Sequence, residues 1–252
     1  MNNNNSFFNK PYVAAAFVLG LAFVVAFIIG GSAVKSLRAG EQSINVTGSA
    51  KERVESDVAK IGGSFERKVA REALATGYKQ INADKDTSVK ILKDLGVKDE
   101  ELTVNPVSSY ETFDYDQNGN RVQGSGMMVL NQSFSVSSSD IAKVKTISEK
   151  ANLFADKGIF VQMQSPQFLY SQEKLAGLRV SLLGKAIEDA KARADVIAKG
   201  SGTSVTKLVG ASSGVVQLLS PDSVNVEDYG SYDTSTVSKD VMVTVKAQFR
   251  LR

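Results

Sequence analysis

A short run of acidic and amide residues is the part of this sequence whose spacing most resembles a chemical site. Side chains with oxygen atoms alternate with other residues along this run: Asp114, Asp116, Asn118 and Asn120. Calcium takes carboxylate and amide oxygens at such alternate positions, as in the first half of a calcium-binding loop. The twelfth position of that loop is Ser125, however, where a bidentate Glu is needed.

The same run contains a strong signal for a hairpin. Asn118-Gly119 lies between two strand-like stretches, and this dipeptide is typical of a two-residue turn between antiparallel strands. We therefore favour a hairpin turn at 114–120 and keep calcium or ligand binding there as the alternative.

Composition removes whole classes of chemistry. The 252 residues include no Cys, His or Trp. Nucleophilic sites built on Cys-His or Ser-His-Asp, and metal sites built on Cys or His, are therefore excluded. Carboxylates, Lys, Tyr and Ser remain, but no spacing assembles them into a catalytic site. We expect no enzymatic activity and no cofactor.

Charge is neutral over most of the chain. The sequence has 30 basic and 27 acidic residues, and Lys10, Lys35 and Arg38 are the only charged residues before Glu41. The remainder thus has no net charge, and it has no basic run. Nucleic-acid binding depends on clustered Lys and Arg, so we expect no nucleic-acid partner.

An uncharged apolar segment at 12–34 follows a short tail at 1–11. As a helix it would extend about 34 Å, enough to cross a bilayer core. It is longer than the apolar region of a cleaved signal peptide, so we predict an uncleaved transmembrane anchor. Three small residues spaced by four could admit a second helix: Ala22, Ala26 and Gly30. Taken alone, the flanking charges slightly favour a cytoplasmic C-terminal domain, because Lys35 and Arg38 follow the segment and only Lys10 and the amino terminus precede it.

A polar linker at 35–43 leads to a single domain at 44–252. Hydrophobic periodicity predicts strands at 44–50, 57–69, 102–113, 121–137, 158–170, 203–219 and 237–251, and helices at 70–95, from Ser138 to Phe154, and up to Gly200. Pro166 makes 158–170 an edge strand or a bend. This order predicts an α+β domain in which long helices pack on antiparallel sheets.

The last long helix is rich in charges of alternating sign. We expect these charges to face water and to pair four residues apart, for example Lys185 with Asp189 and Asp189 with Arg193. Apolar residues at a 4-3-4-3 spacing predict the buried side: Ala176, Val180, Leu183, Ile187, Ala190, Ala194 and Ile197.

The order of elements and several short stretches resemble the SIMPL domain family of bacterial envelope proteins. The matching stretches span 44–252 and include Val46-Thr-Gly48, Asp57-Val58-Ala59, Leu95-Gly96-Val97, the hairpin from Tyr110 to Gly126, and the helix with Ala186, Ala190, Arg193-Ala194, Ile197-Ala198 and Gly200. Family members often have Pro before the Asp of the second strand, where this chain has Ser56.

The resemblance implies an extracytoplasmic protein without known catalytic residues, attached to the bacterial cytoplasmic membrane. Relatives form large ring- or cage-like oligomers, and some are linked to tolerance of oxidative stress. We therefore expect a single-pass membrane protein that assembles with itself in the periplasm or outside the cell. The predicted contact residues lie near 164–170 and in the acidic loop 220–236: Gln164, Phe168, Tyr170, Tyr229 and Tyr232.

Overall fold

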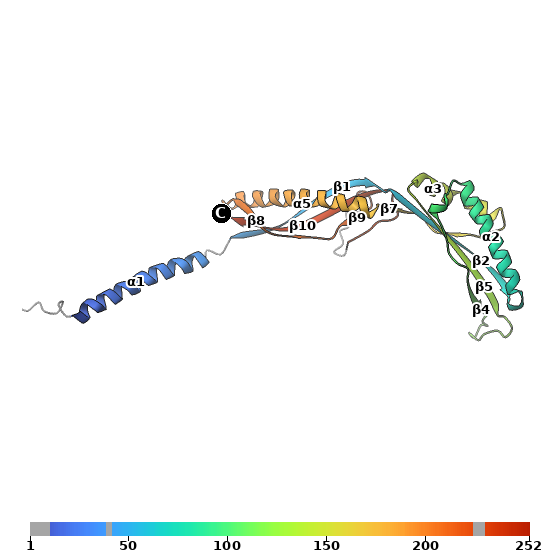
Figure 1. The fold of residues 1–252 in the computed structure, drawn as a ribbon, viewed down its shortest axis with the longest axis horizontal. Coiled ribbons are helices and arrows are strands. Elements are labelled where there is room, and N and C mark those ends of the chain that lie inside the picture. The colour runs from blue at the N-terminus through green and yellow to red at the C-terminus, as the bar shows by residue number, and fades with distance from the viewer. Residues whose placement is uncertain (1–10, 39–41, 224–229) are drawn as a thin grey trace, which may run out of the picture. The chain divides into compact units, whose positions relative to one another are not determined.

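The computed structural model describes residues 11–38, 42–223 and 230–252, and in the N-terminal helix it describes side chains only at 15–27 and 29. Contacts divide the chain into two compact units (Figure 1). The larger unit consists of Ser49–Ile187 and Ser213–Val245, and the smaller unit consists of Met1–Gly48, Glu188–Ser212 and Lys246–Arg252.

The larger unit contains a six-stranded antiparallel sheet. Its centre is the long ladder between β2 (Val58–Ala70) and β5 (Met127–Ser138), which runs from the pair Ala59↔Ser138 to the pair Ala70↔Met127. Shorter strands complete it on both sides: β3 (Leu102–Val104) and β4 (Ser108–Thr112) beside β5, and β6 (Gln162–Met163) and β7 (Gln167–Leu169) beside β2. The interruption between β6 and β7 contains Pro166, as the sequence predicted.

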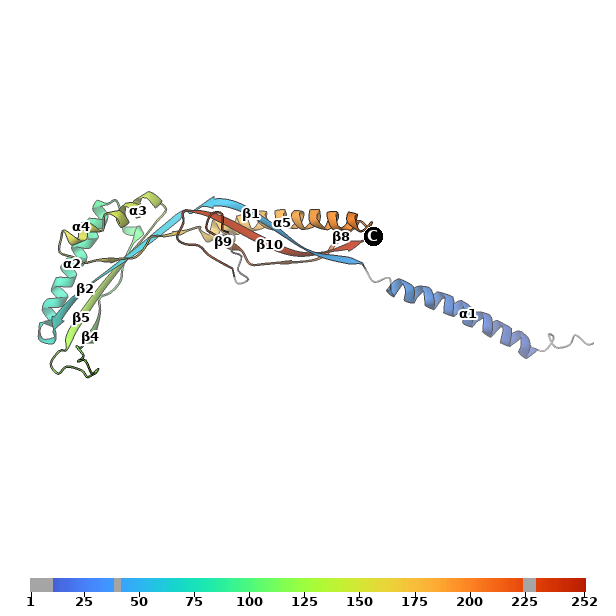
Figure 2. The ribbon, with the colours of Figure 1, turned by 180° about the vertical axis from the view of Figure 1, so that it is seen from behind.

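Three helices cover one face of this sheet: α2 (Leu74–Asp94), α3 (Ile141–Glu149) and α4 (Asn152–Ala155) (Figure 2). One-turn 3-10 helices precede α2 (Arg71–Ala73) and β3 (Asp99–Glu101). Side chains alternate along a strand, so Ala59, Ile61 and Phe65 of β2 all point into this core. The same face of β5 contributes Leu130, Phe134 and Val136.

Two glycines allow close approach in this core. A Cβ atom on Gly63 of β2 would lie 2.6 Å from the ring of Phe134 and 2.8 Å from Val161. A Cβ atom on Gly77 of α2 would lie 2.8 Å from Leu130 and 2.9 Å from Val69. Gly63 therefore leaves room for Phe134 and Val161 over β2, and Gly77 lets α2 lie closer to the sheet than a larger residue would permit.

A second antiparallel sheet has the strand order β1-β10-β8, and β9 also pairs with β10. Its strands are β1 (Ser43–Glu55), β8 (Val205–Ser213), β9 (Gln217–Leu219) and β10 (Ser238–Leu251). The long helix α5 (Gln172–Gly200) provides Leu175 and Leu182, which pack in the larger unit against Leu218, Val241 and Val243.

The buried side of α5 differs from the predicted one. The buried residues are mainly alanines spaced by four, preceded by two leucines: Leu175, Leu182, Ala186, Ala190, Ala194 and Ala198. Val180 and Ile197, which the spacing placed in the core, are 71% and 52% exposed. Small residues let a helix lie close to its neighbours, and this packing outweighs the greater hydrophobicity of Val and Ile.

The predicted α+β class with antiparallel sheets is confirmed, but several predicted elements have other bounds. The strand predicted at 102–113 is two strands, β3 and β4, and the helix predicted from Ser138 to Phe154 is two helices, α3 and α4. The strand predicted at 121–137 begins only at Met127, because Gly124 has a positive φ of 80° in the preceding turn. The strand predicted at 203–219 is two strands, β8 and β9, separated at 214–216.

The N-terminal helix α1 spans Pro11–Arg38. Its described side chains are exposed, and they include Phe17, Phe23 and Phe27. Over the residues that the structure describes, no helix is long and apolar enough to cross a membrane. The predicted transmembrane segment at 12–34 is therefore not confirmed.

Candidate functional site

Among the residues that the structure describes, the most deeply buried cation is Lys239 at the start of β10, whose side chain is 0% exposed. Its ammonium group donates hydrogen bonds to the carbonyl oxygens of Asp233 (2.6 Å) and Thr236 (2.7 Å), and it lies 3.3 Å from the Asp233 carboxylate. Burial lowers the pKa of Lys239, and the charge of Asp233 opposes that change. These contacts hold the segment 233–236 against β10.

The Asp233 carboxylate completes this arrangement. Burial acts to raise its pKa, but hydrogen bonds from Thr236 and Ser235 and the charge of Lys239 outweigh burial and hold the pKa well below its usual value. Each of these partners belongs to the same short stretch of chain. The cluster therefore shapes a loop and presents no free nucleophile or acid.

Asp240, the residue after Lys239, is a buried carboxylate with cationic partners on β1. It accepts hydrogen bonds from Arg53 Nε (2.8 Å), Lys51 Nζ (3.1 Å) and the backbone N–H of Asp222 (3.1 Å). The hydrogen bonds from Arg53 keep its pKa far below the usual range, against the effect of burial. Its acceptor positions are thus taken up by the protein framework.

Two further carboxylates join distant segments. Asp57 accepts hydrogen bonds from the backbone N–H and the hydroxyl of Ser171 (2.7 Å each), just before α5 begins. Glu101 accepts hydrogen bonds from Lys143 (2.8 Å) and from the hydroxyl of Ser138 (2.5 Å). The bonds from Lys143, Lys98 N–H and Ser138 lower the pKa of Glu101 to about 2.

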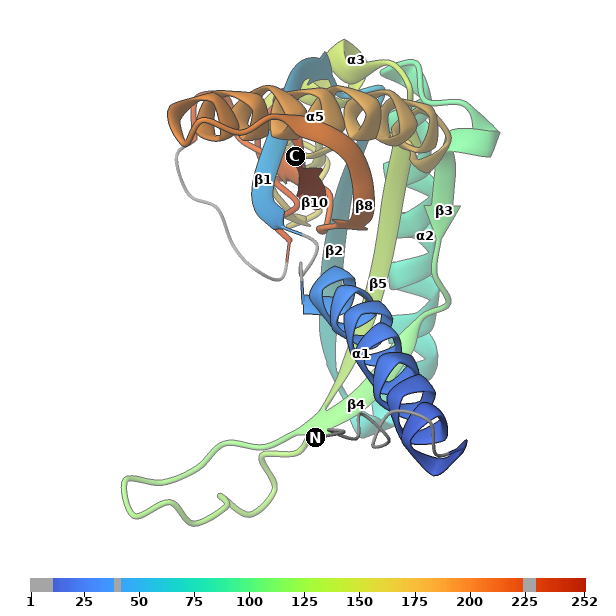
Figure 3. The same cartoon turned by 90° about the vertical axis from the view of Figure 1, so that its left-hand side faces the viewer.

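The hairpin at 114–120 is closed by its own acidic residue. The Asp116 carboxylate accepts hydrogen bonds from the backbone N–H groups of Asn118 (2.9 Å) and Asn120 (2.8 Å), and from the Asn120 amide. Tyr115 and Arg121 form an antiparallel bridge, and Figure 3 shows the segment between β4 and β5 extending away from the sheet. In the described part of the chain, three or more acidic residues nowhere gather as a metal site would need. Asp114 and Asp116 therefore do not belong to such a cluster.

The predicted contact residues fall into different environments. Phe168 is only 8% exposed and belongs to the core of the larger unit, so little of its side chain is open to a contact with another molecule. The Tyr232 hydroxyl donates to the carbonyl of Tyr170 (2.9 Å) and accepts from its N–H, which fixes both residues within the chain. Gln164 is exposed beside a hollow of about 150 Å³.

The other four predicted contact residues lie on α1 or in the segment 220–236. Ala22 and Ala26 are exposed on α1. Gly30 lies outside the described side chains, and Tyr229 lies outside the described residues altogether.

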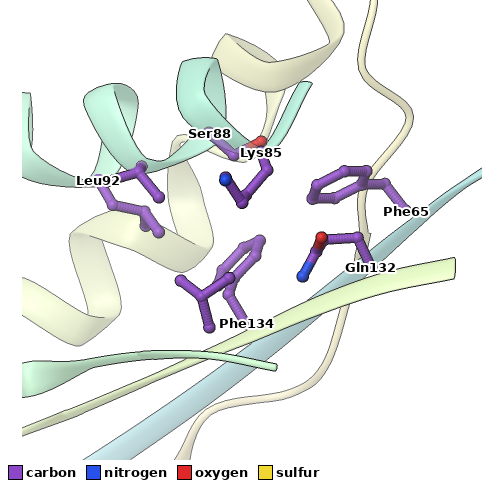
Figure 4. A pocket seen from close by; sticks show the side chains of 8 residues that line it. Phe65, Lys85, Ser88, Leu92, Gln132 and Phe134 are labelled. Carbon is purple, nitrogen blue, oxygen red and sulfur yellow. The ribbon is translucent and has the colours of Figure 1, made fainter. Parts of the chain in front are cut away.

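Figure 4 shows a cavity between α2 and the six-stranded sheet, lined in part by Lys85, Ser88, Gln132 and Phe134. Its volume is about 10 Å³, which is near the minimum for one water molecule. The cavity is therefore part of the packed core and is too small for an organic ligand.

The edge strand β8 is the surface that sequence reasoning missed. It lies at one end of the strand order, and its residues from Thr206 to Ser213 are all exposed. Leu208 and Val209 are 42% and 45% exposed, and Lys207 is the sole charged residue of the strand. The signal in the sequence is a nine-residue stretch without clear alternation, which is typical of a strand with no deeply buried face.

A groove lies beside β8 in the smaller unit. It has a volume of about 400 Å³ and is lined by three consecutive small residues of β8 and by neighbouring residues of β1 and β10: Gly210, Ala211, Ser212, Asn45, Val46, Thr47, Lys246, Ala247 and Gln248. Gly210 has no side chain and Ala211 has only a methyl group, which leaves this space open. An apolar side chain from another molecule could enter it.

These elements define an α+β domain that carries a long exposed edge strand. A model of the SIMPL family, described as a protein of unknown function (DUF541), matches residues 44–249. The chain therefore belongs to the SIMPL family. No curated protein matches it.

Proposed function

We propose that this protein is a non-enzymatic envelope protein that assembles with copies of itself into a large ring- or cage-like homo-oligomer. The observation that supports this proposal most strongly is the exposed edge of β8. An edge strand presents a row of unpaired N–H and C=O groups, and proteins usually protect such an edge with charges, Pro or a covering element.

The two edges of the same sheet differ in their protection. The C-terminal half of β1 carries several charged residues: Lys51, Glu52, Arg53 and Glu55. β8 has only Lys207 and contains no Pro. Pairing with another chain would cover this edge, and the absence of net charge beyond residue 40 limits repulsion between copies.

A non-enzymatic role agrees with the state of the acidic residues. The carboxylates with strongly lowered pKa values, Glu101, Asp233 and Asp240, are held by partners that connect parts of the fold. None of the three lines the cavity beneath α2 or the groove beside β8. Perturbed acids indicate a catalytic site chiefly when they meet in a cleft.

The segment 12–34 would attach the assembly to the bacterial cytoplasmic membrane, with the C-terminal domain in the periplasm or outside the cell. The segment has no charged residue, and the described side chains of α1 are exposed apolar groups that need a cover. Flotation of the full chain with lipid vesicles tests the attachment, and removal of 12–34 should abolish flotation. Protease treatment of intact spheroplasts tests on which side of the membrane the C-terminal domain lies. We expect the domain to be digested, and full protection of the domain would contradict the proposed location.

Sedimentation velocity of the detergent-solubilised full chain tests self-assembly. The proposal predicts a single defined species several times the mass of one chain. A monomer at micromolar concentration would refute it.

A further inference from the structure

The side chains of β8 divide into a larger and a smaller half. The strand begins with Val205, Thr206, Lys207 and Leu208, and after Val209 it continues with Gly210, Ala211, Ser212 and Ser213. Side-chain size therefore falls from one end of the strand to the other. Such a strand is complementary to a copy of itself that runs in the opposite direction.

The backbone directions of β8 follow from its pairing with β10. Ser204 and Arg252 exchange two hydrogen bonds (3.0 and 2.9 Å), so the N–H and C=O of Ser204 point towards β10. These groups alternate in direction along a strand. Lys207, Val209 and Ala211 therefore direct their N–H and C=O groups to the free edge.

We propose that β8 pairs antiparallel with β8 of a second copy about a two-fold axis at Val209, an inference that rests on the proposed self-assembly. This register places Val209 opposite Val209, Leu208 opposite Gly210, and Lys207 opposite Ala211. Leu208 and Lys207 each meet a small residue, and the two Val209 side chains meet at the axis. The outward N–H and C=O groups of Val209 and of the Lys207–Ala211 pair then form hydrogen bonds across the two-fold axis.

The groove beside β8 supports the same register. Directly opposite residues of an antiparallel pair share a face of the sheet. Leu208 of the second copy would therefore lie over Gly210, which lines the groove of about 400 Å³. No atom lies within 4 Å of the position of a Cβ on Gly210 beyond its own neighbours, so there is room for a leucine side chain.

Charge selects the antiparallel register over a parallel one. In the two-fold register, Lys207 faces the uncharged Ala211. In a parallel in-register pair, Lys207 would face Lys207 and Leu208 would face Leu208. Like charges directly opposite each other are destabilising, so a second copy in the antiparallel direction is the best occupant of this edge.

A charge series in the full chain tests the register. Ala211→Lys places the new ammonium group of each copy opposite Lys207 of the other copy, so each two-fold contact contains two pairs of like charges. We expect association to weaken about tenfold. Ala211→Glu places a carboxylate opposite Lys207 and should leave association unchanged or stronger. The double variant Lys207→Glu with Ala211→Lys restores opposite charges and should recover the mass of the unaltered protein.

The mass of each variant in detergent is measured by light scattering at several concentrations, at low and at high salt. Loss of assembly in Ala211→Lys alone, with recovery in the double variant and at high salt, supports the register. If every variant keeps the mass of the unaltered assembly, β8 is not the contact, although self-assembly stands. If both single variants dissociate alike, the register is wrong. A monomeric unaltered protein would refute self-assembly and this inference together.

Discussion

The ammonium group of Lys239 donates a 2.6 Å hydrogen bond to the carbonyl oxygen of Asp233 and lies 3.3 Å from the carboxylate of the same residue. The Lys239 side chain is completely buried, and the Asp233 side chain is 15% exposed. A buried cation costs desolvation energy that its partners must offset. This pair therefore fixes the end of the loop that precedes β10.

Replacing Lys239 while Asp233 is kept should strongly destabilise the fold. Lys239→Met leaves the Asp233 carboxylate without its buried partner, and we expect the free energy of unfolding to fall by about 3–5 kcal/mol. Lys246→Met is the matched control, because Lys246 is an exposed residue of the same strand. Urea unfolding measures both changes, and equal small effects of the two substitutions would contradict the assigned role.

Acid should weaken the link between Glu101 and Lys143. Because the pKa of Glu101 is lowered to about 2 in the folded protein, its contribution to stability is complete above the usual carboxyl range near 4.5 and is lost as the pH falls towards 2. Glu101→Gln should cost about 1.5–3 kcal/mol at pH 7 and much less near pH 2. Urea unfolding at several pH values tests this, with the exposed Glu100→Gln as control. If Glu101→Gln lowered the free energy of unfolding by the same amount at every pH, the ion pair with Lys143 would not be the cause.

Two glycine substitutions should have opposite effects. Gly63→Ala places a Cβ atom 2.6 Å from Phe134, and overpacking of this kind costs about 1–3 kcal/mol. Gly184→Ala lies in α5 with nothing within 4 Å, so higher helix propensity should add about 0.5–1 kcal/mol. Thermal unfolding of the two variants shows whether each substitution lowers or raises stability. If Gly63→Ala raised stability, the core would have room for a methyl group at that position.

Calcium should not stabilise the hairpin at 114–120. The Asp116 carboxylate already accepts three hydrogen bonds from the turn, which also lower its pKa, the backbone N–H of Asn120 most of all. We expect the same melting temperature with calcium and with a chelator. A rise with calcium that disappears in Asp116→Asn would establish the calcium alternative.

Hydrophobic periodicity was sufficient to predict the α+β class and most elements. The alternation along β2 and the helical spacing along α2 arise from one buried face each, which a sequence displays directly. The buried side of α5 was not predictable in this way. Ala186 and Ala198 are buried because the helix lies close to its neighbours, and alanine is a weak hydrophobic signal.

The ionic clusters were hidden for a different reason. Lys239 and Asp240 are adjacent in sequence and both buried, which strand periodicity does not anticipate for charged residues. Arg53, the main partner of Asp240, is 187 residues away, so a single sequence gives no indication of the pair. The exposed edge of β8 likewise depends on the strand order, which local patterns leave open.

The most direct test of self-assembly compares the mass of the full chain in detergent with the mass of a chain that begins at Gly40, by light scattering after size exclusion. Self-assembly through the domain predicts that both form one large, defined species of the same subunit number. A monomeric Gly40 chain beside an oligomeric full chain would assign association to the N-terminal segment, and two monomers would contradict self-assembly of this protein.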